Sequence, residues 1–148
     1  MFGIRMGAPL VALALIALSL PAIAHVRVSP AEAKAGANQV YMVTIPTEGK
    51  SATSRVELVL PAGAKLVSVD EEGKPFDIQH PADGTTVIIF RTEIPPGWAK
   101  MFHFTVTNPN GVSEIAWKAH QFYADGTQAD WTDAPGTKRP ASITKLTP

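Results

Sequence analysis

The chain has 148 residues, 45% of them hydrophobic, and its 13 basic residues balance 13 acidic ones to a formal net charge of zero. This length fits one domain, and the charge balance argues against a general nucleic-acid binder, which would carry a basic excess. The absence of cysteine excludes disulfides, thiol catalysis and cysteine-based metal sites, while 13 prolines and 11 glycines favour short elements joined by turns.

Residues 1–24 have the layout of a secretory signal peptide. Arg5 precedes an apolar run from about Pro9 to Leu20, and small residues then lead up to His25. The run is shorter than the roughly 20 residues that a membrane-spanning helix needs. We therefore expect a Sec-type leader that is cleaved after Ala24 and a mature chain that is periplasmic or secreted, with no membrane span.

The rest of the chain alternates between apolar and polar residues with the period of two that is typical of strands. Turn-forming Pro, Gly, Asn and Asp residues separate the alternating segments. Expected strands are 25–29, 38–46, 54–61, 64–70, 75–79, 85–91, 100–107, 114–124, 128–132 and 141–146. Residues 85–91 are apolar on both faces, which predicts a central strand covered on both sides.

Many short strands at this spacing predict an all-β fold for residues 25–148, taken as a single domain. An immunoglobulin-like antiparallel β-sandwich fits the alternation best, and a small barrel is the alternative. No segment after the leader has a helical period.

His25 carries the most chemical information because cleavage after Ala24 would make it the first residue. A free amine and an imidazole on one residue can chelate a metal through the amine nitrogen and ring Nδ1. The reference pKa of an α-amino group is about 7.7–8.0, so the unprotonated amine is accessible near neutral pH. Nitrogen ligands suit Cu(II), which heads the stability order of divalent first-row ions. The alternative is that the cleavage site merely precedes a histidine.

The other histidines give weaker signals. His80 precedes a proline in a predicted turn and is expected in a solvated loop. His103 and His120 alternate out of phase with apolar neighbours and are expected on sheet faces toward solvent. A three-histidine zinc site lacks any close-spaced pair to support it. No nucleophile-elbow or phosphate-loop signature is present, so no catalytic group is predicted.

Methionine and tryptophan are interpreted as packing residues. Met42 and Met101 are isolated in the sequence, which disfavours a methionine-rich Cu(I) site and predicts that both pack in the core. Trp98, Trp117 and Trp131 are expected as core or rim aromatics.

Four segments together resemble one family. They are AHVRVSPAEAKAG, a strand ending in IPTE, TSRVELVLPAGAK, and AHQFYADGTQADWTD near the C-terminus. In this order, and with His25 directly after the leader, they resemble the YcnI-like family of secreted copper-binding domains. The resemblance extends from His25 to about Thr132. It implies an immunoglobulin-like sandwich that binds Cu(II) in a mono-histidine brace.

The resemblance implies three site residues. His25 matches the N-terminal histidine of the brace, Glu48 the glutamate that closes the IPTE segment, and Trp131 the tryptophan after the Asp-Gly turn. By the same match, Gln121 and Asp125 are strand and turn residues that shape the site. The chain departs from many members in lacking cysteine, and in reading GKPF where they carry Gly-Trp. Many members also continue into a membrane anchor, which we do not expect here.

The predicted function is therefore Cu(II) binding outside the cytoplasm, as a copper chaperone or homeostasis factor that is not an enzyme. The expected partners are the copper ion and a membrane copper transporter or another copper protein. One alternative is a copper-dependent, monooxygenase-like oxidative enzyme, which would require His103 or His120 beside the metal. The other alternative is a metal-free envelope scaffold, for which the sandwich alone is sufficient.

Overall fold

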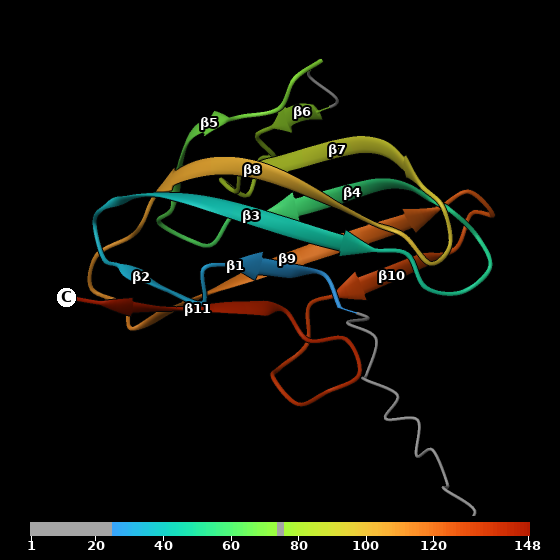
Figure 1. The fold of residues 1–148 in the computed structure, drawn as a ribbon. Coiled ribbons are helices and arrows are strands. Elements are labelled where there is room, and N and C mark those ends of the chain that lie inside the picture. Colours follow the sequence, from blue (N-terminus) through green and yellow to red (C-terminus); the bar gives the residue numbers. More distant parts are fainter. Residues whose placement is uncertain (1–24, 74–75) are drawn as a thin grey trace, which may run out of the picture.

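A computed structural model describes residues 25–73 and 76–148, so the predicted signal peptide, residues 1–24, lies outside the described residues. The described parts form strands joined by turns (Figure 1). The strands are β1 (Arg27–Ser29), β2 (Glu32–Lys34), β3 (Asn38–Pro46), β4 (Thr53–Val59), β5 (Lys65–Val69), β6 (Phe76–Gln79), β7 (Val87–Ile94), β8 (Ala99–Thr107), β9 (Glu114–Tyr123), β10 (Gln128–Trp131) and β11 (Ser142–Thr147). No helix in this part of the chain is long and apolar enough to cross a membrane.

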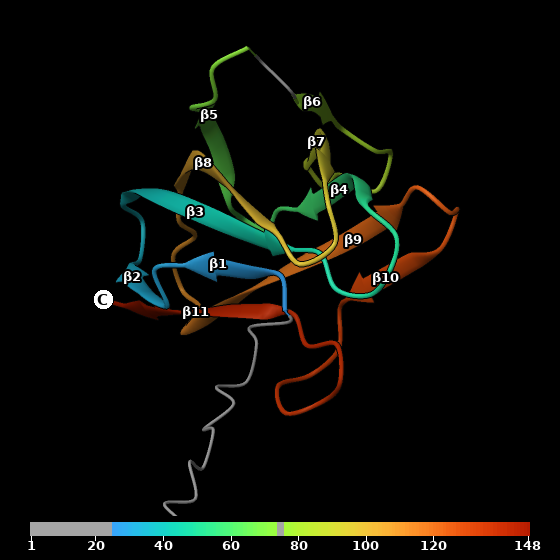
Figure 2. The ribbon, with the colours of Figure 1, turned by 45° about the vertical axis from the view of Figure 1, so that its right-hand side comes forward.

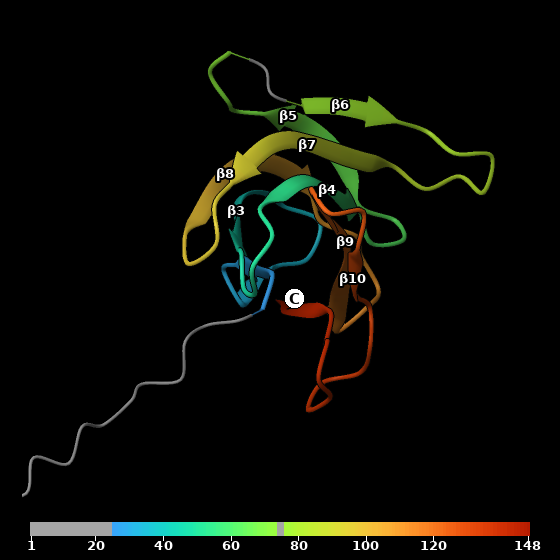
Figure 3. The ribbon, with the colours of Figure 1, turned by 90° about the vertical axis from the view of Figure 1, so that its right-hand side faces the viewer.

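The strands form two sheets packed face to face, which confirms the predicted sandwich. The small sheet has the order β1-β3-β8-β5, and the large sheet has the order β2-β11-β9-β4-β7-β6, with β10 also pairing with β9. Figure 3 views the sandwich nearly end-on, with β3 and β8 on one side and β4, β9 and β10 on the other. The strand pairs within the sheets are antiparallel except one, because β2 pairs with β11 in parallel.

Most predicted strands lie within a few residues of the observed ones. The strand β2 was not predicted, since its three residues contain a single buried side chain, Ala33, and so give no alternation. Residues 87–90 of β7 are buried on both faces, as predicted. Their strand is not central, however, because β7 lies next to the edge strand β6.

An aromatic cluster fills the space between the sheets. The ring of Tyr41 lies 4.7 Å from Trp117 and 5.9 Å from Phe104, measured between centroids. The polar tips of the cluster have partners: the Tyr41 hydroxyl donates to Asn108 Oδ1 at 2.7 Å, and Trp117 Nε1 donates to Thr144 Oγ1 at 3.0 Å. These hydrogen bonds allow large amphipathic rings to be buried without unsatisfied polar groups.

Three residues predicted to pack lie on the outside instead. Trp98 is 70% exposed in the turn between β7 and β8, and Met101 is 57% exposed on β8. Met42 is half-buried on β3, on the face opposite to the fully buried Tyr41 and Val43. The prediction that both methionines pack in the core was therefore wrong, because their positions alternate out of phase with the inward-facing residues of β3 and β8.

Two connections cross between the sheets at the same end of the sandwich. The first is the loop after β3 that carries Glu48, and the second is the turn that carries Trp98. Two backbone hydrogen bonds of 2.9 Å join them, from the Thr47 amide to the Trp98 carbonyl and from the Gly97 amide to the Thr47 carbonyl. Thr47 is buried, so the start of the Glu48 loop is held in place by its neighbour.

Candidate metal centre

The start of β1, the end of β3 and the end of β10 meet at this same end of the sandwich (Figures 1 and 2). β1 pairs antiparallel with β3, with Arg27 opposite Thr44 and Val28 opposite Val43. Continuing this register by two residues places His25 opposite Pro46, just before the Glu48 loop. The buried side chains of Val26 and Val28 anchor the strand that leads away from His25.

One pocket of about 410 Å³ contains all three residues that the motif match singled out. It is lined by His25, Pro46, Glu48, Gly49, Tyr123, Ala129, Trp131, Lys138 and Arg139. The structure therefore brings together an imidazole, a carboxylate and an indole from three separate segments of the chain. These groups supply nitrogen and oxygen donors beside an aromatic wall.

The imidazole of His25 lies against Trp131. Their ring centroids are 5.4 Å apart, and the ring planes meet at 65°, an edge-to-face arrangement. The indole Nε1 of Trp131 donates a hydrogen bond of 3.0 Å to Gln121 Oε1. Because the indole N–H is used in this way and has no lone pair to offer, Trp131 contributes its ring to the pocket and not a nitrogen ligand.

Gln121 is the centre of a buried hydrogen-bond network behind the pocket. Its side-chain Nε2 donates to the Pro46 carbonyl at 2.9 Å and to Thr53 Oγ1 at 2.7 Å. Thr53 Oγ1 lies 2.6 Å from Thr47 Oγ1, which continues the network. One side chain thus connects the tryptophan that packs on His25 to the backbone that leads to Glu48.

Glu48 is exposed at the rim of the pocket, where the chain turns after β3. Gly49 has φ of 84°, a left-handed conformation that suits glycine. Two cations, Lys138 and Arg139, line the same pocket from the loop between β10 and β11. The lining of the pocket therefore carries one carboxylate and two cationic side chains.

The pKa of the Tyr123 phenol responds to the charged residues of the pocket. Its burial raises the pKa of the phenol, the nearby Arg139 guanidinium lowers that pKa, and the carboxylates of Glu48 and Asp125 raise it. The tyrosine therefore lies within electrostatic reach of both the acidic and the basic residues of the pocket.

Opposite substitutions are expected to shift the Tyr123 pKa in opposite directions. Glu48→Gln removes a negative charge that raises the pKa, so the pKa should fall. Arg139→Gln removes a positive charge that lowers it, so the pKa should rise. NMR titration of ring-labelled tyrosine can resolve Tyr123 from the only other tyrosine, Tyr41. Glu32→Gln, on the distant strand β2, is the control, and equal shifts in all three variants would contradict the pocket described.

The remaining histidines lie away from this pocket. His103 is exposed on β8, and its Nδ1 is 3.7 Å from Glu71 Oε1. His120 Nδ1 lies 2.6 Å from Asp130 Oδ1 on the outer face of the large sheet, and this contact lowers the pKa of Asp130. His80 is in an exposed loop, as predicted. Within residues 25–73 and 76–148, no three His, Asp or Glu side chains are grouped closely enough to hold a metal by themselves.

Comparison with known proteins identifies the family. The model of a family described as a domain of unknown function, DUF1775, matches residues 25–146. The chain belongs to this family. The expected resemblance to YcnI-like proteins is thereby confirmed. The match begins at His25, the residue that the leader pattern places first in the mature protein.

Among relatives of this DUF1775 domain is the Bacillus subtilis (strain 168) protein named copper-binding protein CutI. It is 31% identical over 143 residues, which cover 94% of this chain and 70% of CutI.

The solved structures support the fold. A Nocardia farcinica protein with an immunoglobulin-like fold aligns over 84% of this chain and 99% of its own, with a TM-score of 0.66 and 18% identity. An Archaeoglobus fulgidus cohesin aligns over 84% and 91%, with a TM-score of 0.53 and 14% identity.

Some pocket residues of this DUF1775 domain were not predicted as such. Tyr123, Lys138 and Arg139 belong to strand and loop segments whose position follows only from the fold. Gln121 carried a signal, because it occupies an inward position in a strand where Ile115, Trp117 and Ala119 face the core. A glutamine at such a position must find buried hydrogen-bond partners.

Proposed function

We propose that this DUF1775 domain is a Cu(II)-binding protein that acts outside the cytoplasm. The single observation that carries the proposal is the pocket in which His25, Glu48 and Trp131 meet. The similarity to a relative named copper-binding protein supports copper as the ion.

The donor set fits Cu(II). If the leader is removed after Ala24, His25 offers an amine and an imidazole, and Glu48 adds a carboxylate at the pocket rim. Nitrogen and oxygen donors of this kind favour Cu(II), whereas Cu(I) prefers thioethers and thiolates. Trp131 would shield one side of the ion, because its ring already packs at the edge of the His25 imidazole.

The cations in the pocket favour a transport or buffering role. Lys138 and Arg139 can neutralise Glu48 when copper is absent, and they repel a bound cation at short range. Such a site binds copper reversibly, which suits a chaperone or homeostasis factor that passes the ion to a membrane transporter or another copper protein. The signal-peptide pattern of residues 1–24 supports periplasmic or secreted localisation.

Copper titration of the chain that begins at His25 tests this proposal. We expect one equivalent of Cu(II) and an electron paramagnetic resonance spectrum with nitrogen hyperfine coupling. Glu48→Gln should weaken binding by at least about tenfold, since even the loss of an outer-sphere partner typically costs a metal site that much. Glu32→Gln removes the same single negative charge as Glu48→Gln, but at a distant exposed position. This control variant should bind Cu(II) like the wild type. Absence of micromolar copper binding would instead favour a metal-free scaffold.

A further inference from the structure

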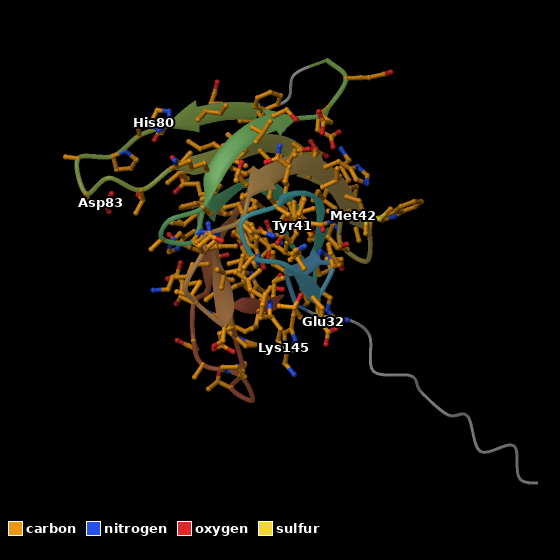
Figure 4. The ribbon with its side chains drawn as sticks, turned by 90° about the vertical axis from the view of Figure 1, so that its left-hand side faces the viewer. Glu32, Tyr41, Met42, His80, Asp83 and Lys145 are labelled. Atoms are coloured by element: carbon orange, nitrogen blue, oxygen red, sulfur yellow. The ribbon has the colours of Figure 1, made fainter. Side chains whose placement is uncertain are left out.

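The outer face of the small sheet carries a second group of metal-ligand side chains. Only two methionines, Met42 and Met101, follow the leader in the sequence, and both lie on this face. Figure 4 shows Met42 toward the outside of β3, while its neighbour Tyr41 lies among the core side chains. His103 shares the face with them, because it is two residues after Met101 on β8.

Strand register makes the three residues neighbours. β3 pairs with β8 so that Met42 is opposite His103 and Thr44 is opposite Met101. Residues directly opposite in an antiparallel pair have Cβ atoms about 4.5–5.5 Å apart, and diagonal neighbours such as Met42 and Met101 lie within about 7–8 Å. Methionine has three rotatable side-chain bonds, so both thioethers can reach a point beside the imidazole.

Glu71 holds His103 from the other side. Its Oε1 accepts the His103 backbone amide at 2.5 Å and lies 3.7 Å from His103 Nδ1. At 3.7 Å the carboxylate is within ion-pair range of the ring but beyond hydrogen-bond distance, so Glu71 fixes the backbone of His103 and lies beside one ring nitrogen without bonding to it. Here that arrangement leaves Nε2 of His103 as the nitrogen without a carboxylate neighbour.

The group remains accessible to solvent. The side chain of His103 is 50% exposed, and Met101 is 57% exposed. Met101 is exposed and Met42 is only half-buried, so neither methionine side chain is enclosed in the core. Two thioethers and one imidazole form a soft donor set, which selects Cu(I) over Cu(II).

We propose that Met42, Met101 and His103 form a Cu(I) site on the outer face of the small sheet. The site is separate from the His25 pocket, because Met42 and Pro46 are four residues apart on β3, which corresponds to about 14 Å of strand. It contains no residue of that pocket and does not depend on cleavage after Ala24. The protein would then hold the two oxidation states of copper with two chemically distinct donor sets.

Titration with Ag(I), a redox-inert ion with the same closed-shell configuration as Cu(I), tests the site by NMR of methyl-labelled methionine. We expect one equivalent of Ag(I) to shift both methionine methyl signals and the His103 ring signals. The Met42→Leu/Met101→Leu variant should weaken binding by at least tenfold. Leucine conserves the volume of methionine, and an unchanged melting temperature would show that the variant is folded.

Two control variants separate this site from other histidines and from the His25 pocket. His80→Gln removes an exposed histidine elsewhere, and acetylation of the His25 α-amine blocks that amine. Both should retain the methyl shifts and the Ag(I) affinity, and a chromophoric Cu(I) chelator should give the same order of affinities for Cu(I). Unshifted methyl signals, undiminished affinity in the double leucine variant, or loss of binding on blocking His25 would each overturn the proposal.

Discussion

Acetylating the α-amine of His25 is expected to lower the Cu(II) affinity of the mature chain by more than about a hundredfold. Acetylation converts the amine of His25 into an amide, whose nitrogen lone pair is delocalised into the carbonyl and is not offered to the metal, and it leaves no free amine that could replace it. Loss of an outer-sphere partner alone typically costs 10–100-fold in affinity, so loss of a direct ligand and of its chelate ring should cost more. The imidazole, Glu48 and Trp131 all remain in place.

Competition titration against a chelator of known affinity measures this change. The acetyl group should not disturb the fold, because β1 begins at Arg27 and the anchoring side chains of Val26 and Val28 stay buried. An unchanged melting temperature would verify this. His25→Ala, which keeps the amine and removes the ring, should weaken binding to a similar degree. Equal affinity and an identical paramagnetic spectrum with and without the acetyl group would refute the role of the amine.

The two chains should also differ in pH dependence. A metal binds the deprotonated amine, so binding releases protons and the affinity of the mature chain should rise as pH increases toward about 8, the ordinary pKa of an α-amino group. In the acetylated chain no α-amine titrates in this range, and the rise over the same range should be smaller. Titrations at several pH values on both chains would reveal the difference.

The strands of the fold were predictable because burial on one face imposes a period of two. β3 matches its predicted range fully, since Tyr41, Val43 and Ile45 alternate with outward residues. Three-residue strands such as β2 contain too few positions to show a period. The place of β7 beside an edge strand depends on which strands pair, and alternation within one segment carries no information about pairing.

The candidate site likewise contains residues that could be predicted from the sequence and residues that could not. His25, Glu48 and Trp131 could be proposed from motif order, and the structure brings them into one pocket. Lys138 and Arg139 reach that pocket only through the path of a loop. The methionines looked isolated because they lie 59 positions apart in the chain, yet the register of β3 and β8 makes them neighbours. In each case the sequence lacked the information about which distant segments of the chain lie side by side in the fold.

Replacement of Gln121 by leucine is expected to destabilise the fold by about 3 kcal/mol. Gln121 is fully buried and makes three side-chain hydrogen bonds, to Trp131 Nε1, Thr53 Oγ1 and the Pro46 carbonyl. Leucine has a similar size but no polar atoms, so it leaves these buried groups without partners. Each such group costs about 1–3 kcal/mol, and partial rearrangement reduces the sum. The melting temperature should fall by roughly 10 °C.

Thermal and denaturant unfolding of the metal-free protein measures this effect. Gln128→Leu is the matched control, because Gln128 is exposed on the neighbouring strand β10 and its side chain bonds only to the exposed Asp130. That variant should unfold within about 0.5 kcal/mol of the wild type, as most exposed substitutions do. A Gln121→Leu variant as stable as this control would show that the network contributes little to the fold.

The Cu(II) affinity of the folded Gln121→Leu variant then shows whether the Gln121 network positions the metal ligands as well as stabilising the fold. Gln121 does not line the pocket, but it fixes the ring of Trp131 that packs on His25 and the backbone that leads to Glu48. If the network also positions the metal ligands, folded Gln121→Leu should bind Cu(II) more weakly. Trp131→Phe, which retains a ring but loses the N–H donor, should then add little further loss in the Gln121→Leu background, because both changes break the same contact. Additive losses would instead mean that Trp131 acts on the site independently of Gln121.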